Sequence, residues 1–169
     1  MGLVILIGAS GAGKTTIAEA FESSFPGEAE ILFFDRIGVP PAAEMIARHG
    51  SGEAWQRAMT IAWLARIAPL VKAGRNVLFE GQTRASFVAE AAATAGAEDD
   101  TLLLIDCDDS TRRDRLRTAR RQPELDNPDM QAWARFLRER AVEDGTVILD
   151  TSAMKVDEAV AFVRSCYPR

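Results

Sequence analysis

The sequence has little of the chemistry that builds metal centres or disulfide frameworks. Its 169 residues include two cysteines, Cys107 and Cys166, and one histidine, His49. Two cysteines so far apart show neither the spacing of a zinc site nor that of a disulfide-rich scaffold. A site built from several imidazoles needs more histidines than the chain has. These absences argue against a metal centre of this kind.

The sequence also lacks a basic excess and a long apolar run. The net charge is −5 and the isoelectric point is about 5.0, which argues against a general binder of nucleic acids or membrane surfaces. No stretch reaches the roughly 20 apolar residues of a membrane span. The apolar N-terminus has no basic leader or cleavage site. We therefore expect a cytoplasmic protein without membrane contact.

Length and composition fit one globular domain over residues 1–169. A chain of this size buries roughly 70% of its unfolded surface, and 47% hydrophobic and 27% charged residues are ordinary for such a domain. No repeat, low-complexity segment or linker interrupts it. The sequence leaves the oligomeric state open.

Short apolar runs alternate with helical patterns along the chain. The runs lack polar alternation, which is typical of parallel strands covered on both faces. This predicts an α/β, three-layer fold with a five-stranded parallel sheet flanked by helices, and ligands at the carboxyl ends of the strands. The predicted strands are 1–7, 31–34, 76–80, 102–106 and 147–150. The predicted helices are 15–24, 42–48, 51–72 with a kink or break at Pro69, 84–94, 110–122, 129–142 and 156–166.

A glycine-rich segment follows the first predicted strand and opens the first predicted helix. Its spacing, Gly-x4-Gly-Lys-Thr over residues 8–15, is typical of a phosphate-binding loop in this context. Glycines let the backbone wrap a phosphate, and the helix N-terminus adds unpaired N–H groups and a positive dipole end. Lys14 can bridge the β- and γ-phosphates, and the Thr15 hydroxyl can bind Mg²⁺. We therefore expect a nucleoside triphosphate to bind here.

Acidic residues end several predicted strands, and two of them are candidates for chemistry. Asp35 follows the second strand and Glu80 ends the third. A carboxylate there can hold Mg²⁺ or take a proton from an attacking hydroxyl. Asp106, Asp108 and Asp150 are interpreted as residues that close strands and cap helices.

Six arginines lie between residues 112 and 121, opposed by Asp114 alone. On a continuous helix Arg113, Arg117, Arg120 and Arg121 would share one face. Their mutual repulsion would be offset by a bound polyanion through charge-assisted contacts. The segment therefore predicts phosphate binding, with a solvated basic face as the alternative.

These motifs together resemble the adenylate-kinase-like group of P-loop kinases. That group includes nucleoside monophosphate kinases and small-molecule kinases such as shikimate and gluconate kinase. The phosphate loop comes first, then Asp35-Arg36 where such kinases place acceptor contacts. The segment 80–84, Glu-Gly-Gln-Thr-Arg, is similar to the group's Asp-Gly-Phe-Pro-Arg. Asp114-Arg115-Leu116 with Arg120-Arg121 resembles the start of the group's lid. The segment 80–84 and the short lid depart from the group's pattern, so the acceptor is not fixed.

The resemblance implies roles for particular residues. Arg115 would pack on the adenine side of ATP, the loop with Thr151 and Ser152 would lie beside the adenine, and Arg120 or Arg121 would close over the phosphates. Arg84 would hold a phosphate of the acceptor. The acceptor region would span about 36–73 and the lid about 112–128. The residues then expected to bind the nucleotide are Gly8, Ala9, Ser10, Gly11, Ala12, Gly13, Lys14, Thr15, Thr16, Arg115, Thr151 and Ser152.

The predicted activity is transfer of the γ-phosphoryl group of Mg-ATP to a nucleotide or another small molecule. Lys14, Asp35, Arg120 and Arg121 are the expected catalytic residues, and Thr15, Asp35 and Glu80 the expected metal ligands. Asp35 would deprotonate a hydroxyl acceptor, whereas Arg84 and Arg36 would bind a phosphate acceptor. Alternatives are a kinase for nucleic-acid 5′-hydroxyls and a P-loop ATPase or switch.

The helix over residues 51–72 has an aromatic stripe that allows two interpretations. Trp55, Met59, Trp63 and Arg66 share one helical face. They could stack on an acceptor ring, or they could pack on the core. Trp55 is retained as a candidate acceptor contact beside Asp35, Arg36, Glu80 and Arg84.

Overall fold

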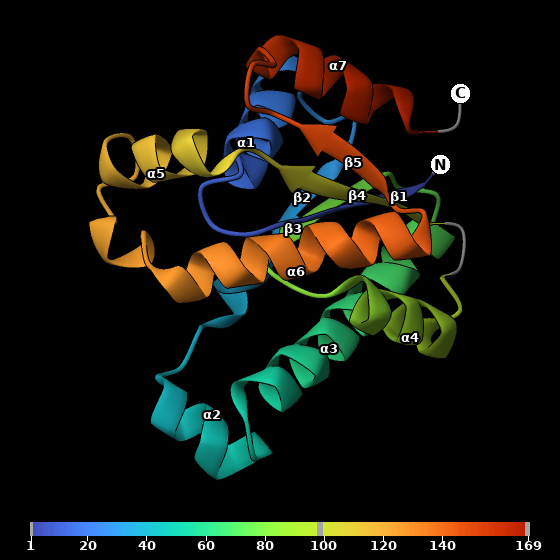
Figure 1. The fold of residues 1–169 in the computed structure, drawn as a ribbon. Helices are drawn as coiled ribbons and strands as arrows, with labels where there is room; N and C mark the ends of the chain where they lie inside the picture. Colours follow the sequence, from blue (N-terminus) through green and yellow to red (C-terminus); the bar gives the residue numbers. More distant parts are fainter. Residues whose placement is uncertain (1, 98–99, 168–169) are drawn as a thin grey trace.

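The computed structural model describes residues 2–97 and 100–167, and Met1 of the predicted first strand lies outside them. Five parallel strands form one sheet in the order β2-β3-β1-β4-β5 (Figure 1). The strands are β1 (Leu3–Ile7), β2 (Glu30–Phe33), β3 (Val77–Gly81), β4 (Asp100–Asp106) and β5 (Val147–Asp150). The predicted five-stranded parallel sheet is confirmed.

Helices cover both faces of the sheet. One face carries α1 (Lys14–Ser24) and α7 (Val156–Ser165), and the other carries α3 (Gly52–Lys72), α4 (Ala85–Ala95) and α6 (Pro128–Asp144). Side chains alternate between the two layers, so Leu3 and Ile5 pack under α3 and α6 while Val4 and Leu6 pack under α1 and α7. Two apolar cores thus fix the sheet between its helices.

Local signals end and begin most helices where the sequence predicts. Ser51 accepts a hydrogen bond from Ala54 N at the start of α3, and Asn127 accepts one from Met130 N at the start of α6. Gly50, Gly96 and Gly145 adopt left-handed conformations that end α2 (Ala42–His49), α4 and α6.

Helix α3 ends where predicted, whereas helix α5 ends earlier than predicted. Helix α3 continues through Pro69 to Lys72 without a break, because a proline in the last turn removes only one helical N–H. Helix α5 (Asp109–Arg117) ends before the predicted residue 122. The chain turns there as Arg120 N donates to Arg115 O, and Arg121 takes a φ of 52°.

The segment predicted to bind the acceptor, about residues 36–73, follows β2. A 3-10 turn, η1 (Phe34–Ile37), leads into α2, which lies away from the sheet at the N-terminal end of α3 (Figure 1). A second 3-10 turn, η2 (Pro123–Leu125), connects α5 to α6. No helix among the described residues is long and apolar enough to span a membrane.

Candidate functional site

The loop from β1 to α1 is built so that only glycine fits at its first position. A Cβ on Gly8 would lie 2.2 Å from the Ile105 carbonyl oxygen, and Gly11 and Gly13 have φ values of 81° and 104°. The loop leads directly into the N-terminus of α1, which begins at Lys14. The first-turn N–H groups of a helix have no partner within it and suit an anion. The loop therefore has the geometry of a phosphate cradle.

Lys14 and Glu80 form the charged centre beside this loop. Both side chains are buried, and Lys14 Nζ donates to Ala9 O at 3.2 Å. Burial lowers the pKa of Lys14, and the Glu80 and Asp35 carboxylates oppose that shift. Burial raises the pKa of Glu80 against the effect of Lys14, and Thr15 Oγ1 donates to Glu80 Oε1 at 3.3 Å. The structure thus brings together Lys14, Thr15, Asp35 and Glu80, four residues predicted from three separate segments.

A cavity of about 380 Å³ lies on the α1 side of the loop. Arg115 forms part of its wall and is fixed by Nη1 bonds to Ala12 O (3.2 Å) and Thr151 Oγ1 (2.9 Å). The size and position suit a nucleoside beside the phosphate cradle. Its lining residues are Gly11, Gly13, Thr15, Thr16, Ile17, Glu19, Arg115, Ala119, Arg120, Thr151, Val156 and Ala159.

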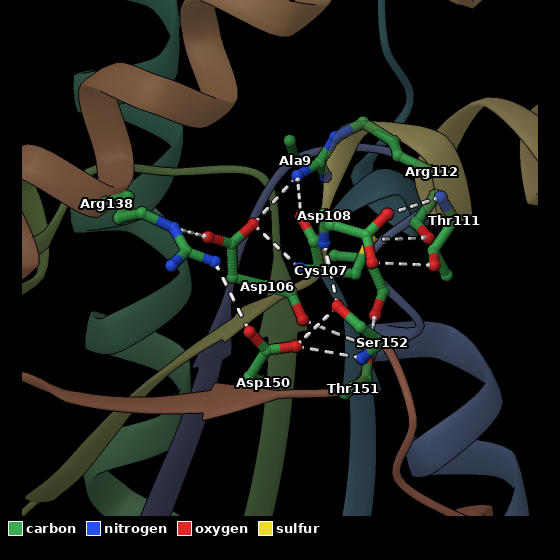
Figure 2. A network of polar contacts seen from close by, with 12 residues as sticks. Ala9, Asp106, Cys107, Asp108, Thr111, Arg112, Arg138, Asp150, Thr151 and Ser152 are labelled. Carbon is green, nitrogen blue, oxygen red and sulfur yellow. Dashed lines mark hydrogen bonds and ion pairs between the residues drawn. The ribbon is translucent and has the colours of Figure 1, made fainter.

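Thr151 and Ser152 are both predicted to lie beside the adenine, but only Thr151 lines this cavity. The Ser152 hydroxyl accepts from Asp108 N at 2.8 Å and donates to Asp150 Oδ1 at 2.6 Å. It therefore joins the ends of β4 and β5, as Figure 2 shows. Asp108 also accepts from Thr111 N at 2.7 Å, which is the capping role predicted for it.

A buried ion network at the end of β4 lies next to the loop. Its central residue, Arg112, is not singled out by the sequence pattern. Arg112 is 3% exposed, and its Nη2 donates to Asp106 Oδ1 and to Cys107 O, each at 2.8 Å. Arg138 Nε binds the other Asp106 oxygen at 2.6 Å. Figure 2 shows the Arg112 guanidinium directed at Asp106 and Cys107 at the end of β4. The network fastens α5 and α6 to the end of β4.

The arginine face predicted over residues 113–121 does not form, because α5 ends at Arg117. Arg113 and Arg117 instead contact Asp126 at 3.5 and 2.7 Å, which ties α5 to the chain after η2. Arg120 lines the cavity of about 380 Å³ on the α1 side of the loop, whereas Arg121 is exposed in the turn. Asp126 thus forms ion pairs with two of the arginines that the sequence pattern assigned to phosphate binding.

A second cavity, of about 320 Å³, lies between η1 and the start of α3. Asp35 faces it, and so does Gln82, whose Oε1 accepts from Ser10 Oγ of the phosphate loop at 3.1 Å. Trp55 also lines it, although this side chain is 8% exposed and packs edge-on against Phe34 at 5.8 Å. Trp63 belongs to the core and donates to Phe34 O. The aromatic stripe therefore packs mainly on the core.

Two arginines predicted to contact an acceptor lie outside this cavity. Arg84 Nη2 binds Glu53 at 2.8 Å, and its guanidinium lies 4.9 Å from the centre of the Phe136 ring. The guanidinium of Arg36 lies 4.1 Å from the centre of the Phe33 ring. This arrangement does not support the predicted role of Arg84 as a contact for the acceptor's phosphate.

Together the sheet order, the glycine loop and the Lys14–Glu80 centre define a P-loop NTPase fold. No family model matches the sequence, and no curated protein matches it significantly. Solved structures do match the fold over nearly the whole chain, as follows.

An unliganded sugar kinase from Janibacter sp. HTCC2649 aligns with a TM-score of 0.72 and 16% identity, over 98% of this chain and 93% of the other. A gluconokinase from Sinorhizobium meliloti 1021 gives 0.62 and 18%, over 98% and 90%. A shikimate kinase from Acinetobacter baumannii in complex with shikimate gives 0.61 and 15%, also over 98% and 90%. The resemblance predicted from the motifs is confirmed at the level of the fold.

Proposed function

We propose that this chain is a kinase that transfers the γ-phosphoryl group of ATP to a small-molecule acceptor. The observation that carries the proposal is the position of the Lys14–Glu80 centre between two cavities. Thr15 lines the cavity on the nucleotide side, while Asp35 lines the cavity on the other side. The Ser10–Gln82 hydrogen bond joins the loop to that second cavity. The three similar structures named above are kinases, which supports the same reaction class.

The nucleotide would occupy the cradle and the first cavity. Backbone N–H groups of the loop and of the first turn of α1 would bind the β-phosphate, and Lys14 would bridge it to the γ-phosphate. Arg115 already stands between the loop and Thr151 through fixed hydrogen bonds. It can therefore support the base without a change in its own contacts.

The donor atoms around Thr15 suit Mg²⁺. The Thr15 hydroxyl is hydrogen-bonded to the buried Glu80 carboxylate, and Asp35 is close enough to shift the pKa of Glu80. One or two carboxylates plus a hydroxyl and substrate phosphates are a common Mg²⁺ site in phosphotransferases. No group of three metal-ligating acidic, histidine or cysteine side chains occurs among the described residues. When bound, Mg²⁺ would neutralise charge that develops on the phosphates.

The acceptor side would supply orientation and a proton acceptor. Asp35 is exposed to the second cavity and can accept the proton of an attacking hydroxyl. Arg120 lies near enough to Lys14 to lower its pKa, so its charge can also reach the phosphates. Closing of the segment after α5 would exclude water, which otherwise competes with the acceptor.

The pH dependence of turnover is expected to report on Glu80. Burial raises the pKa of this carboxyl, so it takes up a proton at a higher pH than an ordinary glutamate. Mg²⁺ binding needs the ionised form, and turnover should therefore fall as the pH drops through that raised pKa. Higher Mg²⁺ concentration should move the acid limb of kcat/KM to lower pH. Glu80→Gln should lower turnover by about 10–100-fold and remove the Mg²⁺-dependent shift. An unchanged acid limb in Glu80→Gln would contradict this assignment.

The experiment that tests the proposal is release of ADP from Mg-ATP with and without acceptors. The panel contains nucleosides, nucleoside monophosphates, sugars, sugar acids, aminoglycosides and a 5′-hydroxyl oligonucleotide. One class should stimulate ADP release at least about tenfold. Asp35→Asn should then lower kcat by about 10²–10⁴-fold if that acceptor is a hydroxyl. The control variant Asp157→Asn changes an exposed aspartate of α7 and should leave kcat unchanged. ADP release that no acceptor changes would favour an ATPase.

A further inference from the structure

We propose that the acceptor is a hydroxyl compound without net negative charge, neutral or cationic, with an apolar body. This inference rests on the proposed kinase function and names the substrate class of the same site. It comes from the charges that line the second cavity and from the contacts of the nearby arginines.

The second cavity presents one charge to a ligand. Among its described lining residues, Asp35 is the single charged side chain, and it is acidic. The buried Glu80 carboxylate lies near Asp35, and both carboxylates act to raise the pKa of Lys14. An anionic group bound in the cavity would meet the Asp35 carboxylate, whereas a hydroxyl or ammonium group could donate to it. The other lining residues are Phe34, Val39, Met45, Gly52, Trp55, Gln56 and Gln82.

The arginines that could neutralise an anion have other partners. Arg84 is bound by Glu53 and stands over aromatic rings of α6. Arg36 stands over Phe33 and is not part of the cavity wall. Arg48 borders the adjoining groove, where its Nη2 pairs with Glu44 at 3.0 Å. None of these three arginines therefore offers the cavity the bidentate contact by which proteins recognise phosphate or carboxylate.

The walls indicate an apolar body on the acceptor. Phe34, Met45 and Trp55 line the cavity, and two of its residues, Val39 and Trp55, also line the adjoining groove of about 400 Å³. That groove adds Ile37, Pro40 and Met59 to the same wall. The groove is also lined by Glu44, Arg48 and His49. A ring or carbon skeleton can extend from Asp35 towards α2 along the apolar side chains of these walls.

The amide of Gln56 fixes the polar edge of this cavity. Its Nε2 donates to Gln82 O at 2.6 Å, and Gln82 Oε1 is taken by Ser10. The two amide side chains thus link the cavity wall to the phosphate loop by hydrogen bonds, and they add no charge to the cavity. The acceptor would be read by hydrogen bonds to neutral groups and by the Asp35 carboxylate.

The test compares acceptors of matched skeleton and different charge. The pairs are nucleosides against their 5′-monophosphates, and glucose and glucosamine against gluconate and glucuronate, with aminoglycosides as polycationic members. Transfer of ³²P from [γ-³²P]ATP to each compound is measured with the full chain. We expect kcat/KM for the neutral or cationic members of the accepted skeleton to exceed that for the anionic members at least tenfold. Equal or better transfer to the anionic members would overturn the inference while leaving the kinase function intact.

A charge introduced into the wall provides a second test. Val39 is 53% exposed, so an arginine there can be accommodated without repacking the core. Val39→Arg should lower the ratio of kcat/KM for neutral or cationic acceptors to kcat/KM for anionic acceptors by about tenfold, because transfer to the anionic acceptors improves. Val39→Gln, which adds no charge, should leave that ratio unchanged. An unchanged preference in Val39→Arg would contradict an electrostatic origin. Label that reaches only inorganic phosphate with every compound would overturn the proposed function and this inference together.

Discussion

Replacing Lys14 by alanine is expected to lower ATP turnover by at least about 10³-fold, the range found when a phosphate-stabilising cation is lost from a phosphotransfer site. Lys14 is buried beside the loop, and its Nζ contacts Ala9 O in the cradle. Its removal takes away the cation closest to the expected phosphates and leaves Glu80 without its opposing charge. Both effects weaken binding of the γ-phosphate in the transition state.

The measurement is kcat/KM for ADP formation at saturating acceptor. Lys14→Met separates charge from volume because it keeps most of the apolar stem, and it should lose as much activity as Lys14→Ala. Lys72→Ala, which removes an exposed lysine at the end of α3, should retain full activity. Thermal unfolding of each variant would show that the fold persists. Turnover by either Lys14 variant within tenfold of wild type would refute the phosphate role.

Replacing Arg112 by methionine is expected to destabilise the fold by about 3–5 kcal/mol, the usual cost of breaking a buried ion pair by removing one partner. Arg112 and Asp106 are both nearly inaccessible, and their hydrogen bond measures 2.8 Å. The substitution also leaves Cys107 O without its donor. A Cβ on Gly11 would lie 3.1 Å from Arg112 Cγ, so this side chain also packs directly on the loop.

Urea unfolding at neutral pH measures this loss. Arg138→Met is the matched control, because Arg138 binds the same carboxylate from a position that is 45% exposed. It should cost about 1 kcal/mol or less. Equal losses for the two variants, or a loss below about 1 kcal/mol for Arg112→Met, would show that burial does not set the strength of this network.

The sequence predicts those parts of the site that depend on local backbone chemistry. The phosphate loop is one, since glycine at positions 8, 11 and 13 is required by conformation and close approach within a few residues. The strands are another, because continuous apolar runs between turn signals have few other solutions in an α/β pattern. Asp35 and Glu80 follow from these, since parallel strands end at one edge of the sheet.

Residues whose partners are distant in the sequence could not be assigned in the same way. Arg113 and Arg117 pair with Asp126, and Arg84 pairs with Glu53. Periodicity shows that arginines gather in one segment, but it does not show which carboxylates the fold brings to them. Arg112 is the clearest case, because its burial depends on Asp106 at the end of β4 and on the packing of α5 against the loop.

The proposed function requires that the γ-phosphoryl group goes to an acceptor and not to water. The most direct measurement is the partition of label from [γ-³²P]ATP between an organic phosphate and inorganic phosphate, in the presence of the acceptor that stimulates ADP release. We expect most of the label to enter the organic product in wild type, and Lys14→Ala to form neither product. Label found in inorganic phosphate alone, whatever acceptor is added, would contradict the proposed kinase function.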